Sequence, residues 1–78
     1  MAVVLTMPDP PEGLASMLDQ MSGALTVSEL TPILGYGRSA LYEMAAGGRI
    51  PHYRIGSSIR FDPHEVARWL RARAVKAA

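Results

Sequence analysis

Residues 25–61 read LTVSELTPILGYGRSALYEMAAGGRIPHYRIGSSIRF, and this stretch carries the local signals that decide the fold. Thr26 and Glu29 have the spacing of a capping box, in which the hydroxyl accepts from an amide of the first helical turn and the carboxylate reaches back. Apolar residues then recur at helical spacing, at Val27, Leu30, Ile33 and Leu34. Gly35 follows them directly, so the pattern predicts a helix that ends there.

Pro32 lies inside this predicted helix and conflicts with it. Because proline removes a backbone hydrogen bond and crowds the previous turn, we expect a kink or a strained short helix. A tight turn at residues 35–37 leads to a second predicted helix, from about Arg38 to Ala46, which Gly47-Gly48 would stop. Its inward side would carry Leu41, Met44 and Ala45. Two helices joined by a short glycine-containing turn form a helix-turn-helix, a pair that also occurs in proteins that never contact DNA.

A β-hairpin is predicted next, because residues 53–55 and 59–61 both alternate between apolar and polar side chains. A three-residue loop at 56–58 would pair Ile55 with Ile59 and Tyr53 with Phe61 on one face. Arg54 and Arg60 would then lie together on the other face. Like charges directly opposed across two strands are destabilising, so this register predicts an anion, such as a phosphate, between the two arginines.

The last predicted helix starts at Asp62. It has an acidic N-cap, a proline at the first helical position and Glu65 at the third. Its buried stripe would be Val66, Trp69 and Leu70. Trp69 is predicted to anchor the core rather than to stack on a ligand, since large aromatic side chains dominate small cores. Together these patterns predict a mainly α fold with a small two-stranded antiparallel hairpin, which is a winged helix-turn-helix over residues 25–72.

The flanking segments are an N-terminal arm, residues 1–24, and a C-terminal tail, residues 73–78. Pro8, Pro10 and Pro11 indicate a loop. A short amphipathic helix is predicted at 12–21 from residues that recur at helical spacing: Leu14, Met17, Leu18 and Met21. Because a helix of that length is marginal alone, it would pack on the domain or meet a partner, with disorder as a third option.

Several functional classes are not expected. The chain of 78 residues has room for one domain, and the absence of cysteine excludes disulfides and thiolate metal sites. His52 and His64 have no ligand cluster around them, so no zinc site is expected. Without a Ser/His/Asp set or a phosphate-binding glycine loop, we expect no enzyme, no cofactor and no small-molecule substrate. The first residues lack the features of a signal peptide, and no apolar stretch approaches the ~20 residues of a membrane span.

The net charge of +1 hides an asymmetry between the two halves of the chain. Residues 1–37 contain four acidic residues and no lysine or arginine, whereas residues 38–78 contain all eight basic residues and three acidic ones. A charge split of this kind indicates a polyanionic partner for the second half, or a basic surface that is merely solvated.

The signals of residues 25–70 occur together, and in this order, in one known family. The matching positions are residues 25–30, 34–35, 38–42, 48–51, 53–56, 59–61 and 66–70. On these residues the chain resembles the excisionase-type winged helix-turn-helix family, small relatives of the MerR-like DNA-binding domains. It departs from the family at Pro32, at Gly37, where a serine-like cap is common, and at Ser57-Ser58, where the wing tip is often more basic.

The resemblance implies that the second helix of the pair enters the major groove of double-stranded DNA. Helical spacing places the candidate residues on the face away from Leu41 and Ala45: Arg38, Ser39, Tyr42, Glu43 and position 46. Arg38 could pair with guanine or a phosphate, Ser39 with either, and Tyr42 with a phosphate or a thymine methyl group. Glu43 could accept from cytosine or simply keep the helix soluble.

The hairpin would act as a wing that follows the adjacent backbone or the minor groove. Its candidate contacts are Arg54, Ser57, Ser58 and Arg60. Contacts of this kind to phosphates fix register and supply affinity without reading sequence. Arg49 is a further candidate for a backbone contact, or it is only solvated.

The resemblance implies a cytoplasmic, bacterial or phage-encoded accessory factor that binds adjacent DNA sites and bends the duplex, so that an integrase excises rather than integrates. One domain this small buries little DNA, so self-association on neighbouring sites or a partner recombinase is expected. A transcriptional regulator of a phage, prophage or plasmid operon is the first alternative. A protein-interaction module on the same fold is the second.

Overall fold

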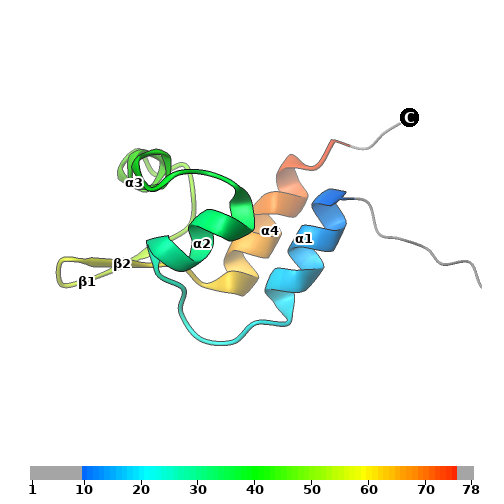
Figure 1. Cartoon of the computed structure of the whole chain (residues 1–78), viewed down its shortest axis with the longest axis horizontal. Helices are drawn as coiled ribbons and strands as arrows, with labels where there is room; N and C mark the ends of the chain where they lie inside the picture. The colour runs from blue at the N-terminus through cyan, green and yellow to red at the C-terminus, as the bar shows by residue number, and fades with distance from the viewer. Residues whose placement is uncertain (1–9, 76–78) are drawn as a thin grey trace, which may run out of the picture.

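The computed structural model describes residues 10–75 of the chain. Four helices and a two-stranded antiparallel hairpin follow one another along it (Figure 1). They are α1 (Pro10–Asp19), α2 (Val27–Leu34), α3 (Arg38–Ala46), β1 (Tyr53–Ile55), β2 (Ser58–Arg60) and α4 (Pro63–Arg73). The predicted fold class, a mainly helical winged helix-turn-helix, is confirmed. The first nine residues of the predicted arm and residues 76–78 of the tail lie outside the described residues.

The start of α2 is fixed by the capping box that the sequence predicts. Glu29 N donates to Thr26 Oγ1 at 3.1 Å, and Thr26 N donates to Glu29 Oε1 at 2.8 Å. The helix continues through Pro32 for eight residues in all, although the missing N–H of Pro32 deprives the Ser28 carbonyl of a helical donor. It ends at Gly35, whose φ of 76° places it in the left-handed region that favours glycine.

The two later helices begin in different ways. At the start of α3, Gly37 offers no side-chain hydrogen bond, as the sequence predicts. At the start of α4, Asp62 Oδ1 accepts from His64 N at 2.9 Å, and Pro63 occupies the first turn, where its missing N–H costs nothing. The predicted acidic N-cap of α4 is therefore confirmed.

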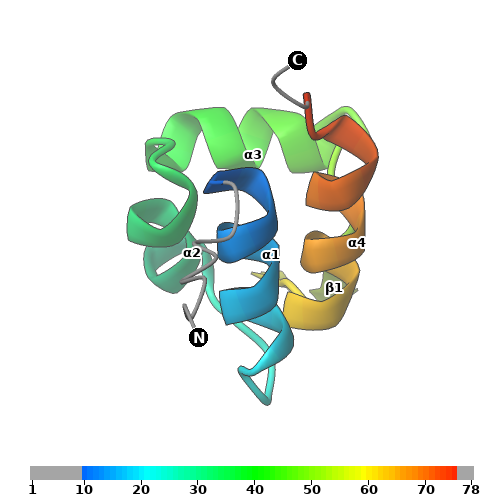
Figure 2. The same ribbon diagram turned by 90° about the vertical axis from the view of Figure 1, so that its right-hand side faces the viewer.

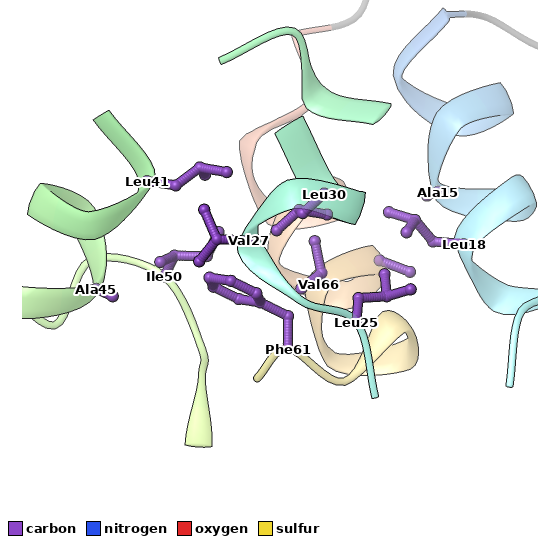
Figure 3. Close-up of a cluster of buried hydrophobic side chains, with 11 residues drawn as sticks. Ala15, Leu18, Leu25, Val27, Leu30, Leu41, Ala45, Ile50, Phe61 and Val66 are labelled. Carbon is purple, nitrogen blue, oxygen red and sulfur yellow. The ribbon is translucent and has the colours of Figure 1, made fainter. Parts of the chain in front are cut away.

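The core lies between α1, α2, α3, α4 and the base of the hairpin, and Phe61 is its central aromatic residue (Figure 3). Phe61 is fully buried, whereas Trp69 is only partly buried at the edge of the core. The prediction that Trp69 anchors the core is confirmed only in part: the ring packs against the core but stays partly buried, because its indole also has to satisfy an N–H, which donates to Arg49 O at 2.7 Å. Phe61 carries no such polar group and takes the interior position.

Two backbone hydrogen bonds join the beginning of the helix-turn-helix to the end of the hairpin. Leu25 N donates to Phe61 O at 2.8 Å, and Phe61 N donates to Leu25 O at 2.9 Å, which forms an isolated antiparallel bridge. Phe61 directly follows the strand β2, and Leu25 directly precedes the cap of α2. This bridge therefore holds the base of the wing against the entrance to α2.

The short helix expected at 12–21 is present as α1, two residues earlier at each end, and it packs against α4 (Figures 1 and 2). Ala15 and Leu18 on α1 are fully buried, whereas Met17 of the predicted apolar stripe is 45% exposed. Of the three states considered for this segment, the structure shows packing on the domain. An ion pair reinforces it, because Arg71 Nη2 lies 2.7 Å from Asp19 Oδ2.

The hairpin closes with a two-residue turn rather than the predicted three-residue loop. Gly56 has a φ of 63°, whereas Ser57 has a negative φ, the combination found in a type II′ turn. Such a turn matches the right-handed twist of the strands, and glycine at its first central position makes it accessible. The paired residues are Tyr53 with Arg60, Arg54 with Ile59, and Ile55 with Ser58. The predicted register is therefore wrong by one residue.

Candidate nucleic-acid interface

The exposed face of α3 is the one that helical spacing predicts. Leu41 and Ala45 are buried in the core (Figure 3). The candidate side chains on the opposite face are all exposed: Arg38, Ser39, Tyr42, Glu43 and Ala46. This face combines a guanidinium group, a hydroxyl, a half-exposed phenol and a carboxylate. It therefore presents donors, acceptors and an apolar ring along one side of a helix.

Arg38 has a neighbour that the sequence did not reveal. Its Nη2 donates to Ser28 Oγ at 2.7 Å, which links the first turn of α3 to the first turn of α2. A guanidinium group has five N–H donors, so this bond orients Arg38 while leaving most of them available. The two residues are ten positions apart, and no local pattern predicts their contact. Ser28 is exposed and thereby joins the candidate face of α3.

The wing arginines do not lie on one face. Residues directly opposite each other in a pair of strands share a face, so Arg54 lies on the same side of the ribbon as Ile59. Arg60 lies on the other side, together with Tyr53. The predicted convergence of Arg54 and Arg60 on a single face is wrong, because it depended on the three-residue loop. The two charges are separated by the ribbon itself and need no anion between them.

The two wing arginines also differ in exposure. Arg54 is exposed, as is Ser57 in the turn, whereas Arg60 and Ser58 are intermediate. The Arg60 Nη1 donates to the backbone oxygen of Ile59 at 3.0 Å, which holds its side chain along β2. Arg54 is therefore the more freely extended of the two cations.

The register correction also reverses two apolar positions. Ile55 and Tyr53 were expected to share a face with Ile59 and Phe61, but they lie on the other face and are 64% and 47% exposed. The Tyr53 hydroxyl instead donates to Glu65 Oε2 at 2.9 Å. This hydrogen bond to a carboxylate raises the pKa of the Tyr53 phenol, because the bond and the nearby negative charge both favour the protonated form.

Arg49 lies beside α4, where its backbone oxygen accepts from Trp69 Nε1. Its side chain passes over Gly47, where an added Cβ would lie 3.4 Å from Arg49 Nε. Arg49 lines a shallow hollow together with Tyr36, Met44, Trp69 and Arg73. The Arg73 guanidinium stacks over the Trp69 ring at 4.4 Å from its centroid. The contacts of Arg49 are thus with the segment before it and with α4.

The helix α3 and the hairpin project at the same end of the molecule, whereas α1, packed on α4, lies toward the other end (Figure 1). Viewed along the long axis, α1 and α4 stand in front and α3 with β1 lies behind them (Figure 2). The helix α3 and the wing therefore share one end of the molecule, away from α1. The acidic Asp19 on α1 lies outside this region and is paired with Arg71.

Two further features, a metal site and a membrane-spanning helix, were searched for within residues 10–75. This part of the chain contains no group of three or more histidine, cysteine or acidic residues that could hold a metal ion. Among the described helices, none has both the length and the apolar character needed to cross a membrane.

Comparison with known proteins agrees with this geometry. Residues 24–74 match the family described as the helix-turn-helix domain, and this range includes α2, α3, the hairpin and α4. Searches of the curated proteins and of the solved structures gave no match. The family match spans more than half of the chain. A helix-turn-helix domain supports DNA as the partner. The chain belongs to the helix-turn-helix domain family.

Proposed function

We propose that this protein is a sequence-specific DNA-binding accessory factor of the excisionase type, which binds and bends DNA to direct site-specific recombination. The observation that carries the DNA-binding part is the family match over residues 24–74, combined with a face of α3 that is exposed beside the wing. The excisionase role rests on the resemblance of residues 25–70 to that family.

In this proposal α3 enters the major groove, where each base pair presents its own pattern of donors and acceptors. Arg38, already oriented by Ser28, contacts a guanine edge or a phosphate beside it. Ser39 and Tyr42 lie on the same exposed face and contact neighbouring bases or the thymine methyl group. Glu43 accepts from cytosine or repels wrong placements.

The wing contributes affinity rather than sequence reading. Because Arg54 and Arg60 lie on opposite faces of the ribbon, they contact phosphates of different strands instead of sharing one phosphate. Ser57 and Ser58 at the tip add hydroxyl contacts to the backbone. Arg49 reaches a phosphate only if the duplex extends past the end of α3 toward α4.

A single domain of this size covers about 600–1,000 Å² of protein surface on DNA, at the low end for specific complexes. Tight binding therefore requires several copies on adjacent sites or a second protein such as an integrase. Both would raise the effective affinity without any change in the contacts of one domain.

The decisive experiment is a salt titration of binding to a fluorescently labelled mixed-sequence duplex, from about 50 to about 200 mM salt. Phosphate contacts predict a steep linear fall of log affinity with log salt concentration. Replacing Arg38, Arg54 and Arg60 together by glutamine should lower the slope by about 2 to 3, because each phosphate that is no longer neutralised reduces it by roughly 0.9. A flat response of the natural protein would favour the interaction-module alternative.

Arg68→Gln is the control, because Arg68 is an exposed arginine on α4 that lies outside the proposed contacts. It should leave the slope unchanged. The recombination role is then separated from the transcriptional one by mapping the occupied sites in cells. Clusters of sites beside a recombination site support excision, whereas isolated sites at promoters would support a regulator.

A further inference from the structure

We propose that Ile55 is an apolar wedge that enters the minor groove of double-stranded DNA and inserts between two stacked base pairs, so that the wing kinks the duplex. This inference rests on the proposed DNA binding and adds the physical origin of the bend. It assigns a contact to a residue whose predicted role was only to pair with Ile59.

The first observation is the position of Ile55 in the hairpin. It forms the last pair of the ribbon with Ser58, and only Gly56 and Ser57 lie beyond that pair. All three neighbours at the tip are small, so the isoleucine side chain stands above them. At 64% exposure, Ile55 is the most exposed large apolar side chain within the described helices and strands.

The second observation is that Ile55 contributes nothing to the core. The two-residue turn places it on the face opposite Ile59, which packs against the core. Ile55 is absent from both the buried cluster and the partly buried residues around it. Its apolar surface is therefore available to a ligand, and a single polar replacement should leave the fold intact.

The third observation is the placement of charge behind the tip. Arg54 is in the next pair along the ribbon and Arg60 is in the pair after that, and they lie on opposite faces. The minor groove is about 6 Å wide and is walled by two phosphate strands. A ribbon that enters the groove tip first would present one guanidinium group to each wall. This arrangement would centre Ile55 over the base edges.

The combination of an apolar tip and flanking cations indicates that the tip binds the minor groove of DNA. Proteins that bend DNA from the minor groove insert apolar side chains, isoleucine among them, and thereby unstack a base step and kink the helix. A protein partner would account for an exposed isoleucine. It would not account for one arginine on each face of the ribbon behind it.

The test measures the unwinding that accompanies unstacking, which requires no knowledge of the preferred site. A closed circular plasmid is relaxed by a topoisomerase in the presence of the full chain, and the linking number is read after the protein is removed. Ile55→Thr keeps β-branching and removes most of the apolar surface. Ile55→Leu keeps the apolar surface. Met17→Thr is the matched control, since Met17 is an exposed apolar residue on α1.

At equal occupancy of the plasmid, the natural protein, Ile55→Leu and Met17→Thr should shift the linking number by the same amount. Ile55→Thr should bind but lose most of the shift, with its thermal unfolding unchanged. A full shift by Ile55→Thr would overturn the wedge. The wedge would also be overturned if Ile55→Thr kept the linking-number shift per bound molecule but no longer associated with other copies of the protein. Ile55 would then be a contact between proteins.

The plasmid experiment distinguishes an error in the wedge from an error in the proposed DNA binding. If the natural protein binds the plasmid with steep salt dependence but does not shift the linking number, only the wedge is wrong. If the natural protein does not bind the plasmid at all, the proposed DNA binding and the wedge are both wrong.

Discussion

The two ends of the molecule use their arginines in different ways. At the α1–α4 end, Arg71 is held at 2.7 Å by the carboxylate of Asp19, which is on the same helix as the buried Ala15 and Leu18. At the end formed by α3 and the wing, Arg54 extends into solvent from a ribbon only three residues long in each strand. Residues of the same type therefore stabilise the fold at one end and remain available to a partner at the other. Net charge alone does not reveal this division.

The largest effect on stability should come from a change in the hydrophobic core, which both ends of the molecule share. Phe61→Ala should lower the free energy of unfolding by about 3–5 kcal/mol, because it leaves a cavity between α2, α3 and α4. A core of this size rarely supplies more than ~3–5 kcal/mol in total, so the variant should be largely unfolded. Urea denaturation followed by circular dichroism measures this destabilisation. A folded variant with near-normal stability would show that Phe61 is not the central residue.

A pair of arginine variants tests the division between the two ends directly. Arg54→Gln should weaken DNA binding and reduce the salt slope by about 1, with no change in melting temperature. Arg71→Gln should leave DNA binding and the salt slope unchanged and lower the melting temperature, because it removes the ion pair between α4 and α1. Anisotropy titrations and thermal melts of both variants provide the comparison. Equal effects of the two variants on DNA binding would remove the distinction.

The capping box of α2 should contribute less than the core. Thr26→Ala removes the acceptor of the Glu29 amide and should cost about 1 kcal/mol of unfolding free energy. Because α2 supports the start of α3 through Ser28 and Arg38, the same variant should also loosen α3. Hydrogen exchange of the α2 and α3 amides would detect this. Unchanged exchange in α3 would show that the two helices are not coupled.

Acid should weaken the α1–α4 end in particular. The hydrogen bond from Arg71, followed by that from His64, lowers the pKa of the Asp19 carboxyl below its ordinary value. The stabilisation is therefore present above the ordinary pKa of about 3.9 and is lost as the pH falls through the lower pKa of the folded state. Asp19→Asn should make the melting temperature less dependent on pH below about 4. A pH profile identical to that of the natural protein would exclude this contribution.

The smallest expected effect is a gain at the start of α3. Gly37 is extended, with φ of −73° and ψ of 167°, and an added Cβ would meet nothing within 4 Å. Gly37→Ser should therefore supply the missing cap and raise the unfolding free energy by a few tenths of a kcal/mol. A small rise in melting temperature would be its measure. A loss of stability would mean that the hydroxyl does not reach an amide of the first turn.

The features that could be predicted from the sequence are those set by neighbouring residues. The capping box of Thr26 and Glu29, the Asp62-Pro63 start of α4 and the exposed face of α3 all depend on spacings of four residues or fewer. Each is present in the structure. These signals are sufficient to place the helices and therefore the fold class.

The features that could not be predicted depend on choices between equivalent local patterns or on distant contacts. Gly56-Ser57-Ser58 is compatible with a two-residue or a three-residue loop, and a difference of one residue moves every side chain of a strand to the other face. The contact between Arg38 and Ser28 depends on how two helices cross. The choice of Phe61 over Trp69 as the central residue depends on where an indole N–H finds an acceptor.

The bridge between Leu25 and Phe61 joins the base of the wing to the residue before the cap of α2. Phe61 also belongs to the buried cluster that contains side chains of α2 and α3, so the attachment of the wing and the packing of these helices depend on the same residue. Loss of this single pairing would let the ribbon swing independently of α3. The angle between the two would then no longer be fixed before a ligand arrives.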